Sequence, residues 1–345
     1  MEYRSLGRSG TMVSRVCVGT MNFGGRTPEP DAHAILDRAA DSGVNFIDTA
    51  NVYGHEPAHF EAGRGRSEEI VGRWLRGRRD HFVVATKVFF PMSDEPGAIG
   101  AGRRNVIREC DASLRRLGTD WIDLYQLHHP SNDIPIDETL RALDDLVTAG
   151  KVRHVGTSSF AAWQLVEALW ASDRLATVRM VSEQPVYNLL DRRIERELVP
   201  MADTFGIGLL TWSPLAGGLL TGTYRRDRLA PPGTRFAEFW QTDPRSLAST
   251  VFDAVDAITE LAAGAEQSVP QLAQSWVLSQ PTVTSMIVGP RTIEQLDTSL
   301  ACTPLEPAVV EALDRIAPPG HCLHPQYGAD GLAWHPWGPH RHRWP

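Results

Sequence analysis

The stretch Phe82-Val83-Val84-Ala85-Thr86-Lys87 decides the fold class, together with the 41 residues that follow it. It is a short apolar run rich in β-branched residues, and a second such run, Ile122-Asp123-Leu124-Tyr125-Gln126-Leu127-His128, closes the stretch. Between the two runs, residues 103–117 have the pattern of an amphipathic helix. Nearly continuous apolar strands that are separated by helices are typical of a parallel sheet covered by helices. This unit therefore predicts an α/β protein.

The same alternation continues along almost the whole chain. Strands are expected at 15–19, 46–49, 82–87, 122–128, 152–157, 180–184, 208–212 and 285–288. Helices are expected at 31–42, 67–76, 103–117, 137–149, 161–172, 192–205 and 246–262. Eight such units predict a closed (β/α)8 TIM barrel. The competing fold, a doubly wound sheet, would need a phosphate-binding fingerprint, and neither GxGxxG nor GxxxxGK[ST] occurs in the chain.

Three segments depart from the strand-helix rhythm. Residues 2–12 contain the turn signal Gly7-Arg8-Ser9-Gly10 and predict an N-terminal β-hairpin that closes one end of the barrel. Long loops at 88–102 and 215–245 follow the third and seventh strands, on the face where barrel enzymes keep their sites. We expect residues 1–317 to form a single barrel domain and residues 318–345 to form a tail rich in His, Trp and Pro, whose spacings match no zinc pattern.

Composition excludes several classes of function. The 345 residues carry a formal charge of −8, which leaves no basic stripe for nucleic acid or for an anionic membrane surface. The four cysteines lie far apart without a CxxC pair, which fits a reducing compartment. The chain shows neither a signal-peptide pattern nor an apolar stretch of membrane-spanning length. A cytoplasmic protein with a small-molecule substrate is therefore expected, and the oligomeric state is left open, a homo-oligomer included.

Four side chains near predicted strand ends form a chemically coherent group. Only two of the 34 basic residues are lysines, and Lys87 stands at the end of a buried strand. Asp48 and Tyr53 follow the second strand, and His128 ends the fourth. A phenol has a pKa of about 10, and a nearby ammonium lowers that value by favouring the phenolate. We expect Asp48 to balance the charge of Lys87, Tyr53 to donate a proton to a carbonyl oxygen, and His128 to orient the substrate.

Each member of this group also has a purely structural interpretation. Asp48 is able to cap a turn, Tyr53 to pack as an aromatic side chain, and His128 to serve as a core histidine. Lys87 would then be a lysine left by chance at a strand edge in a chain whose basic residues are almost all arginine. The joint placement of all four at one predicted mouth favours the catalytic interpretation.

Seven ordered stretches resemble the aldo-keto reductase superfamily, and the subgroup of potassium-channel β subunits and bacterial aldo-keto reductases in particular. They are GTMNFG (19–24), NFIDTANVYG (45–54), ATK (85–87), DASLRRL (111–117), IDLYQLHHP (122–130), GKVRHVGTSSF (150–160) and WSPLAGGLLTG (212–222). The resemblance implies a catalytic tetrad at Asp48, Tyr53, Lys87 and His128. It also implies an extended nicotinamide dinucleotide at the barrel mouth, which accounts for the missing glycine fingerprint.

The resemblance assigns cofactor contacts position by position. Ser158, Ser159 and Gln184 would hold the carboxamide, Trp212 would stack on the nicotinamide, Ser213, Leu215 and Gly217 would line the pyrophosphate, and Gly289, Arg291 and Gln295 would meet the adenosine end. Many family members have Asn where Ser159 stands, and Thr298-Ser299 replaces a Glu-Asn pair. Arg291, if it points at a 2′-phosphate, would favour NADPH (NADP+) over NADH, and its structural alternative is a solvated residue at the start of a helix.

The leading hypothesis is an NADPH-dependent carbonyl reductase. Candidates for the substrate wall are Phe23, Phe89, Phe90, His129 and Trp240. The resemblance suggests a keto-deoxysugar or another carbonyl compound of secondary metabolism as one substrate. An NADP(H)-binding sensor subunit with slow or no turnover is the alternative from another class. A metal-dependent barrel lyase or isomerase would need more carboxylate or histidine ligands at strand ends than Asp48 and His128 provide.

Overall fold

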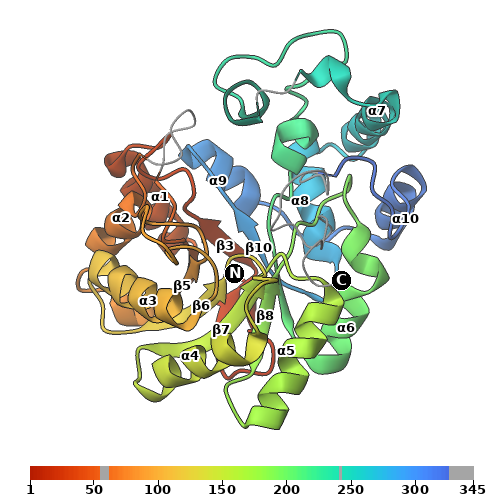
Figure 1. Ribbon diagram of the computed structural model, residues 1–345. Coiled ribbons are helices and arrows are strands. Elements are labelled where there is room, and N and C mark those ends of the chain that lie inside the picture. Colours follow the sequence, from red (N-terminus) through yellow and green to blue (C-terminus); the bar gives the residue numbers. More distant parts are fainter. Residues whose placement is uncertain (55–61, 241–242, 326–345) are drawn as a thin grey trace.

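Eight parallel strands form a closed barrel in the computed structural model, which describes residues 1–54, 62–240 and 243–325 (Figure 1). The barrel strands are β3 (Val16–Gly19), β4 (Phe46–Asp48), β5 (Val83–Val88), β6 (Ile122–Leu127), β7 (Val152–Ser158), β8 (Met180–Gln184), β9 (Gly208–Thr211) and β10 (Val283–Val288). Each strand pairs in parallel with the next, and β10 closes the barrel on β3, with Val288 opposite Val18. The predicted TIM barrel is confirmed.

Helices surround the barrel and cover its outer face (Figure 1). They are α1 (Glu29–Asp41), α2 (Arg66–Trp74), α3 (Arg103–Leu117), α4 (Ile136–Thr148), α5 (Ala162–Leu175), α6 (Leu198–Phe205), α7 (Ser249–Gly264), α8 (Val269–Ser279), α9 (Ile293–Leu300) and α10 (Pro307–Ile316). Short helical turns are η1 (Arg79–His81), η2 (Arg193–Arg196), η3 (Ala216–Thr221), η4 (Phe236–Trp240) and η5 (Pro244–Ser246). Helix α4 shows the packing rule, because Leu140, Leu143 and Leu146 lie on one face and are all buried.

One predicted helix is wrong in its extent. The expected helix 192–205 is divided into η2 and α6, and Glu197 between them leaves helical geometry with φ −137°. The cause is tertiary, because Arg192 at the start of the segment donates its amide to His321 O at 2.9 Å and its guanidinium to Asp314 at 2.7 Å. These contacts fix the chain before a regular helix begins.

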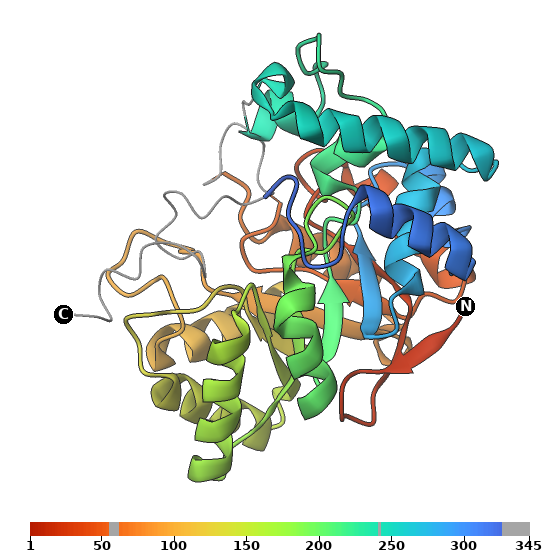
Figure 2. The same ribbon diagram turned by 90° about the vertical axis from the view of Figure 1, so that its right-hand side faces the viewer.

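The predicted N-terminal hairpin is confirmed as a plug at the amino end of the barrel. It consists of β1 (Tyr3–Ser5) and β2 (Met12–Ser14), which pair antiparallel. Leu6 and Val13 are fully buried and join the apolar cluster inside the barrel. Gly7 adopts φ +56°, and a Cβ atom there would lie 2.1 Å from the carbonyl oxygen of Val181, so the turn requires glycine. Figure 2 shows the hairpin at one end of the barrel and the long connection before α7 towards the other.

The segment after α10 is fastened to the barrel. Leu323 donates its amide to Leu190 O at 2.8 Å, next to the Arg192 contacts. The remainder of the predicted tail, residues 326–345, lies outside the described residues, and the predicted division of the chain at residue 318 stays a prediction. Within the described ranges, no helix combines the length and the apolar character that are needed to cross a bilayer.

Candidate active site

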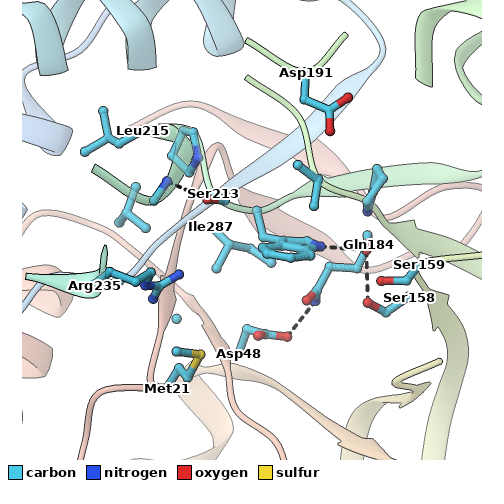
Figure 3. A pocket seen from close by; sticks show the side chains of 18 of the residues that line it. Met21, Asp48, Ser158, Ser159, Gln184, Asp191, Ser213, Leu215, Arg235 and Ile287 are labelled. Atoms are coloured by element: carbon cyan, nitrogen blue, oxygen red, sulfur yellow. Dashed lines mark hydrogen bonds between the residues drawn. The ribbon is translucent and has the colours of Figure 1, made fainter. Parts of the chain in front are cut away.

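A cavity of about 1360 Å³ opens at the carboxyl ends of the barrel strands. Figure 3 shows its length: Ser158, Ser159 and Gln184 lie at one end, and Leu215 and Arg235 lie at the other. This volume exceeds the range of about 300–1,000 Å³ that is typical of sites for small ligands. The cavity therefore suits an extended ligand with room for a second, smaller one.

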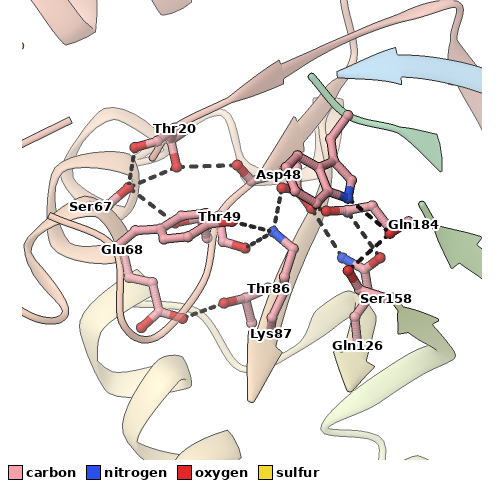
Figure 4. A network of polar contacts seen from close by, with 12 residues as sticks. Thr20, Asp48, Thr49, Ser67, Glu68, Thr86, Lys87, Gln126, Ser158 and Gln184 are labelled. Atoms are coloured by element: carbon pink, nitrogen blue, oxygen red, sulfur yellow. Dashed lines mark hydrogen bonds and ion pairs between the residues drawn. The ribbon is translucent and has the colours of Figure 1, made fainter. Parts of the chain in front are cut away.

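Lys87 is the central cation of this mouth. Its side chain is fully buried on β5, and its Nζ donates to Asp48 Oδ2 at 2.5 Å, to Thr49 O at 2.9 Å and to the Tyr53 hydroxyl oxygen at 3.3 Å (Figure 4). Burial alone would lower the pKa of Lys87, but the Asp48 carboxylate and Tyr53 more than offset this and raise that pKa above its usual value. Lys87 is therefore an ammonium ion directed at a phenol.

Asp48 is fixed by two amide side chains as well as by Lys87. Gln126 Nε2 donates to Asp48 Oδ1 at 3.0 Å, and Gln184 Nε2 donates to the same oxygen at 2.8 Å (Figure 4). Both amides are buried, on β6 and β8. Gln126 was not among the predicted site residues. Its signal in the sequence is a polar residue two positions before His128, in the second half of a largely apolar run.

His128 lies against the phenol of Tyr53. The two rings meet edge to face with centroids 5.7 Å apart, and the His129 ring stacks on the His128 ring with centroids 5.4 Å apart. Burial, the charge of Lys87 and the neighbouring His129 hold the pKa of His128 well below its usual value. Its Nδ1 atom is buried and has no hydrogen-bond partner among the described residues. The ring is therefore neutral at neutral pH.

The predicted aromatic wall is only partly at the cavity. Phe90 and His129 line it, next to Tyr53 and His128. Phe89 packs behind them, with its ring 5.4 Å from that of His129, and does not reach the cavity surface. Phe23 is fully buried in the outer core, because the chain turns after β3 so that Met21 and Asn22 face the cavity instead. The side chain of Trp240 lies outside the described residues.

The residues expected to contact the nicotinamide and its carboxamide lie around one backbone carbonyl. Gln184 O accepts hydrogen bonds from Ser158 Oγ at 3.0 Å and from Trp212 Nε1 at 3.2 Å. Ser159, the next residue, has φ +61°, a conformation that non-glycine residues rarely adopt. All four side chains line the cavity.

The remaining predicted contacts form the far half of the groove. Ser213, Leu215, Gly217, Gly289, Arg291 and Gln295 all line it. Ser213 also has a positive φ of 60°, and its hydroxyl accepts the amide of Gly217 at 3.3 Å. Arg291 donates its amide to Gln295 Oε1 at 2.9 Å at the start of α9. Strained non-glycine residues such as Ser213 cluster at functional sites in proteins.

The long connection after β9 contacts the loop after β3 and the segment between β10 and α9. Arg26 Nη2 donates to Glu238 Oε2 at 2.7 Å, and Arg291 Nη1 donates to Gly233 O at 3.1 Å. Both arginines also line the cavity. These contacts hold the connection beside the groove.

The described part of the chain contains no group of three or more His, Cys, Asp or Glu side chains arranged to hold a metal ion. Most histidines of the C-terminal tail lie beyond the residues covered by this search.

The family model described as "Aldo/keto reductase family" matches residues 15–318. An uncharacterized oxidoreductase of Bacillus subtilis, YrpG, is 39% identical over 86% of this chain and 89% of its own length. A probable voltage-gated potassium channel subunit beta of rice is 36% identical over 92% and 95%. L-glyceraldehyde 3-phosphate reductase of Escherichia coli is 32% identical over 86% of each chain. The chain belongs to the aldo/keto reductase family and has oxidoreductases among its relatives.

Proposed function

We propose that this chain is an NADPH-dependent carbonyl reductase in which Tyr53 is the general acid. One observation carries the proposal: the buried Lys87 ammonium lies 3.3 Å from the Tyr53 oxygen and is held there by Asp48. An ammonium at this distance stabilises the phenolate that remains after proton donation. The acid is thereby matched to a carbonyl oxygen that gains negative charge.

Asp48 gives Lys87 its role. Without a carboxylate, a fully buried lysine tends to lose its proton, and a neutral amine would not stabilise a phenolate. Gln126 and Gln184 in turn keep Asp48 from rotating away, since both donate to its second oxygen. The network thus keeps the positive charge at a fixed point below the phenol.

His128 would contribute a neutral imidazole beside the reacting oxygen. Its low pKa prevents it from competing with Tyr53 as the acid, because it holds no extra proton to give at neutral pH. Its position at the edge of the Tyr53 ring supports a role in orienting a carbonyl between the two groups.

The donor set of the groove fits a nicotinamide dinucleotide. The hydroxyls of Ser158 and Ser159 suit an amide, the Trp212 ring offers a flat apolar surface, and the turn from Ser213 to Gly218 suits phosphates. When bound, NADPH would supply the hydride. Arg291, Arg26 and Arg235 lie near one another, which supports NADPH over NADH, since clustered guanidinium groups suit a 2′-phosphate.

The substrate class is inferred from the wall beside Tyr53. Phe90 and the His128–His129 stack offer flat, largely apolar surface, which suits an aldehyde or ketone with a ring or chain attached. Relatives include one named for a phosphorylated aldehyde and one named versiconal hemiacetal acetate reductase, from Aspergillus parasiticus. A panel of substrates should therefore include simple aldehydes, phosphorylated aldehydes and keto-deoxysugars.

The test compares the wild type with Tyr53→Phe. We expect the wild type to oxidise NADPH with at least one carbonyl of the panel. The variant should lose at least about a hundredfold in kcat, since general acids contribute about 10²- to 10⁴-fold, and should still bind NADPH with unchanged affinity. Turnover that survives in the variant would remove Tyr53 from the proposed role.

A second candidate is supported by the rice relative, which is named as a channel subunit. In this case the chain would be an NADP(H)-binding sensor subunit. Tight NADPH binding without turnover on any carbonyl of the panel would favour the sensor.

A further inference from the structure

Glu183 is a fully buried acid that the proposed chemistry does not use. It stands on β8 directly before Gln184. Successive side chains of a strand point to opposite faces. Since Gln184 reaches Asp48 inside the mouth, Glu183 points to the outer side, beneath the turn that leads from β7 into α5.

The carboxyl group of Glu183 is bound to both ends of this turn. Thr157 Oγ1 donates to Glu183 Oε2 at 2.5 Å, and the backbone amide of Phe160 donates to Glu183 Oε1 at 3.0 Å. One side chain therefore joins the last residues of β7 to the approach to α5.

The residue between these two contacts is strained. Ser159 has φ +61°, a backbone conformation that is unfavourable for a non-glycine residue. Strain of this kind persists only where the surroundings determine the conformation. The contacts of Glu183 at Thr157 and Phe160 flank Ser159 on both sides and restrict the backbone to this geometry.

A charge-balancing role does not account for Glu183. The equally buried Glu68 accepts a hydrogen bond from the Arg116 guanidinium at 2.6 Å. Glu183, in contrast, forms its hydrogen bonds with neutral donors of the turn. Burial raises the pKa of Glu183 to about 8, which the bonds from Thr157 and from the amides of the turn only partly offset. Burying the Glu183 carboxyl is unfavourable, and its contacts with the turn explain why the residue is present at this position.

We propose that Glu183 is a positioning residue for nicotinamide binding: it keeps the Thr157–Phe160 turn in the conformation that presents the Ser158 and Ser159 hydroxyls to the groove. This inference rests on the proposed function, because it assumes that those hydroxyls meet the carboxamide. It assigns Glu183 no proton transfer and no contact with substrate.

The experiment measures two affinities by calorimetry in the full chain. NADPH reports on the whole groove, whereas 2′,5′-ADP lacks the nicotinamide and reports only on the adenosine end. For Glu183→Leu, we expect a loss of about tenfold in NADPH affinity and a change of less than about twofold for 2′,5′-ADP, the equivalent of about 1.4 kcal/mol confined to one end. Glu183→Gln retains an oxygen acceptor for the Phe160 amide and should stay within about threefold of the wild type for both ligands.

Glu68→Gln is the matched control, because it removes a carboxyl of equal burial from α2, away from the turn. It should leave the ratio of the two affinities unchanged. If Glu183→Leu does not fold, Thr157→Val removes the hydroxyl donor while keeping the side-chain shape, and a loss of about threefold for NADPH alone is expected.

An equal loss for both ligands, or no loss in a folded variant, overturns the inference. Because the readout is binding, a wild type that binds NADPH without turnover contradicts the reductase and leaves the Glu183 comparison valid. A wild type that binds neither ligand overturns both.

Discussion

At the scale of single residues, the Lys87–Asp48 pair is both the centre of the proposed chemistry and a contact on which stability depends. Both side chains are buried, so removing one charge strands the other in a medium of low polarity. Without the Lys87 ammonium, the Gln126 and Gln184 amides are the remaining side-chain donors that Asp48 is shown to bond, and they carry no charge to balance it. Stability and the proposed activity therefore depend on the same contact. Removing both charges should restore stability but not activity.

Lys87→Met should lower the free energy of unfolding by about 3–5 kcal/mol, because Asp48 is left as an uncompensated buried charge. The double variant Asp48→Asn/Lys87→Met should recover much of this loss without recovering turnover. Urea denaturation measures the stabilities. The control Lys151→Met removes a half-exposed lysine paired with Asp111 and should cost about 1 kcal/mol or less. A single variant as stable as the wild type would contradict the buried-charge argument.

Glu183 predicts how stability depends on pH. Its folded-state pKa of about 8 lies above the usual value of 4.5, so the folded protein binds more protons than the unfolded chain between these values. The contribution to stability is therefore complete below about pH 4.5 and is lost as the pH rises through 8. The slope reaches about 1.4 kcal/mol per pH unit. Relative to Glu183→Gln, the wild type should lose stability between about pH 5 and 8 in urea titrations, and parallel curves would refute this.

The sequence predicts part of the site for a physical reason. Asp48, Lys87 and His128 end apolar runs, and the geometry of a parallel barrel brings such ends together. Gln126 and Glu183 were not predicted in this way. Gln126 stands two positions before His128 and Glu183 one position before Gln184, and each faces a neighbour known only from the fold. Phe23 and Phe89 were misplaced because an aromatic side chain near a mouth is equally suited to the core.

At the scale of elements, the N-terminal hairpin is the most separable part of the design. It fills the amino end of the barrel through Leu6 and Val13, while the cavity opens at the carboxyl end. Its contribution to stability is therefore independent of the chemistry.

Leu6→Ala should lower the free energy of unfolding by about 2–5 kcal/mol, because it leaves a cavity in the closed interior. The kcat of the folded fraction should not change. Chemical denaturation and active-site titration provide the two measurements. Met12→Ala serves as the control, since Met12 is half exposed and its removal should cost little. A change in kcat would mean that the two ends of the barrel are coupled.

Elements whose ends are set by local sequence were predicted more accurately than elements whose ends are set by tertiary contacts. Strand β8 begins and ends as predicted, because Met180–Gln184 lies between Arg179 and Pro185, and a proline cannot donate a backbone hydrogen bond that would extend the ladder. The division of 192–205 depends on the contacts of Arg192 with His321 and Asp314, over 120 residues away, which local spacing does not encode. Local pattern thus predicts the barrel, and tertiary contacts decide where its connections bend.

At the scale of the whole molecule, residues that are far apart in the sequence meet beside the groove. Arg26 follows the first barrel strand, and its partner Glu238 belongs to the connection after the seventh. This contact spans 212 positions in sequence and lies beside the cavity. Holding the connection in place should slow release of a ligand from the groove.

Arg26→Ala should therefore increase the dissociation rate of NADPH by about fivefold, the equivalent of about 1 kcal/mol for a partly exposed ion pair. Stopped-flow displacement measures this rate. Arg38→Ala breaks a comparable surface pair with Asp297, away from the cavity, and should leave the rate unchanged. Equal rates for the wild type and Arg26→Ala would show that the pair does not restrain the connection.

The scarcity of lysine has a practical outcome for anyone who wishes to attach a dye or a surface to this protein. Of the two lysines, Lys87 is sealed from solvent, while 40% of the Lys151 side chain is exposed, at the start of β7 and remote from the mouth. Amine-reactive reagents should therefore modify only Lys151 and the N-terminal amine. The protein can be conjugated at defined points with the proposed reaction centre left unmodified.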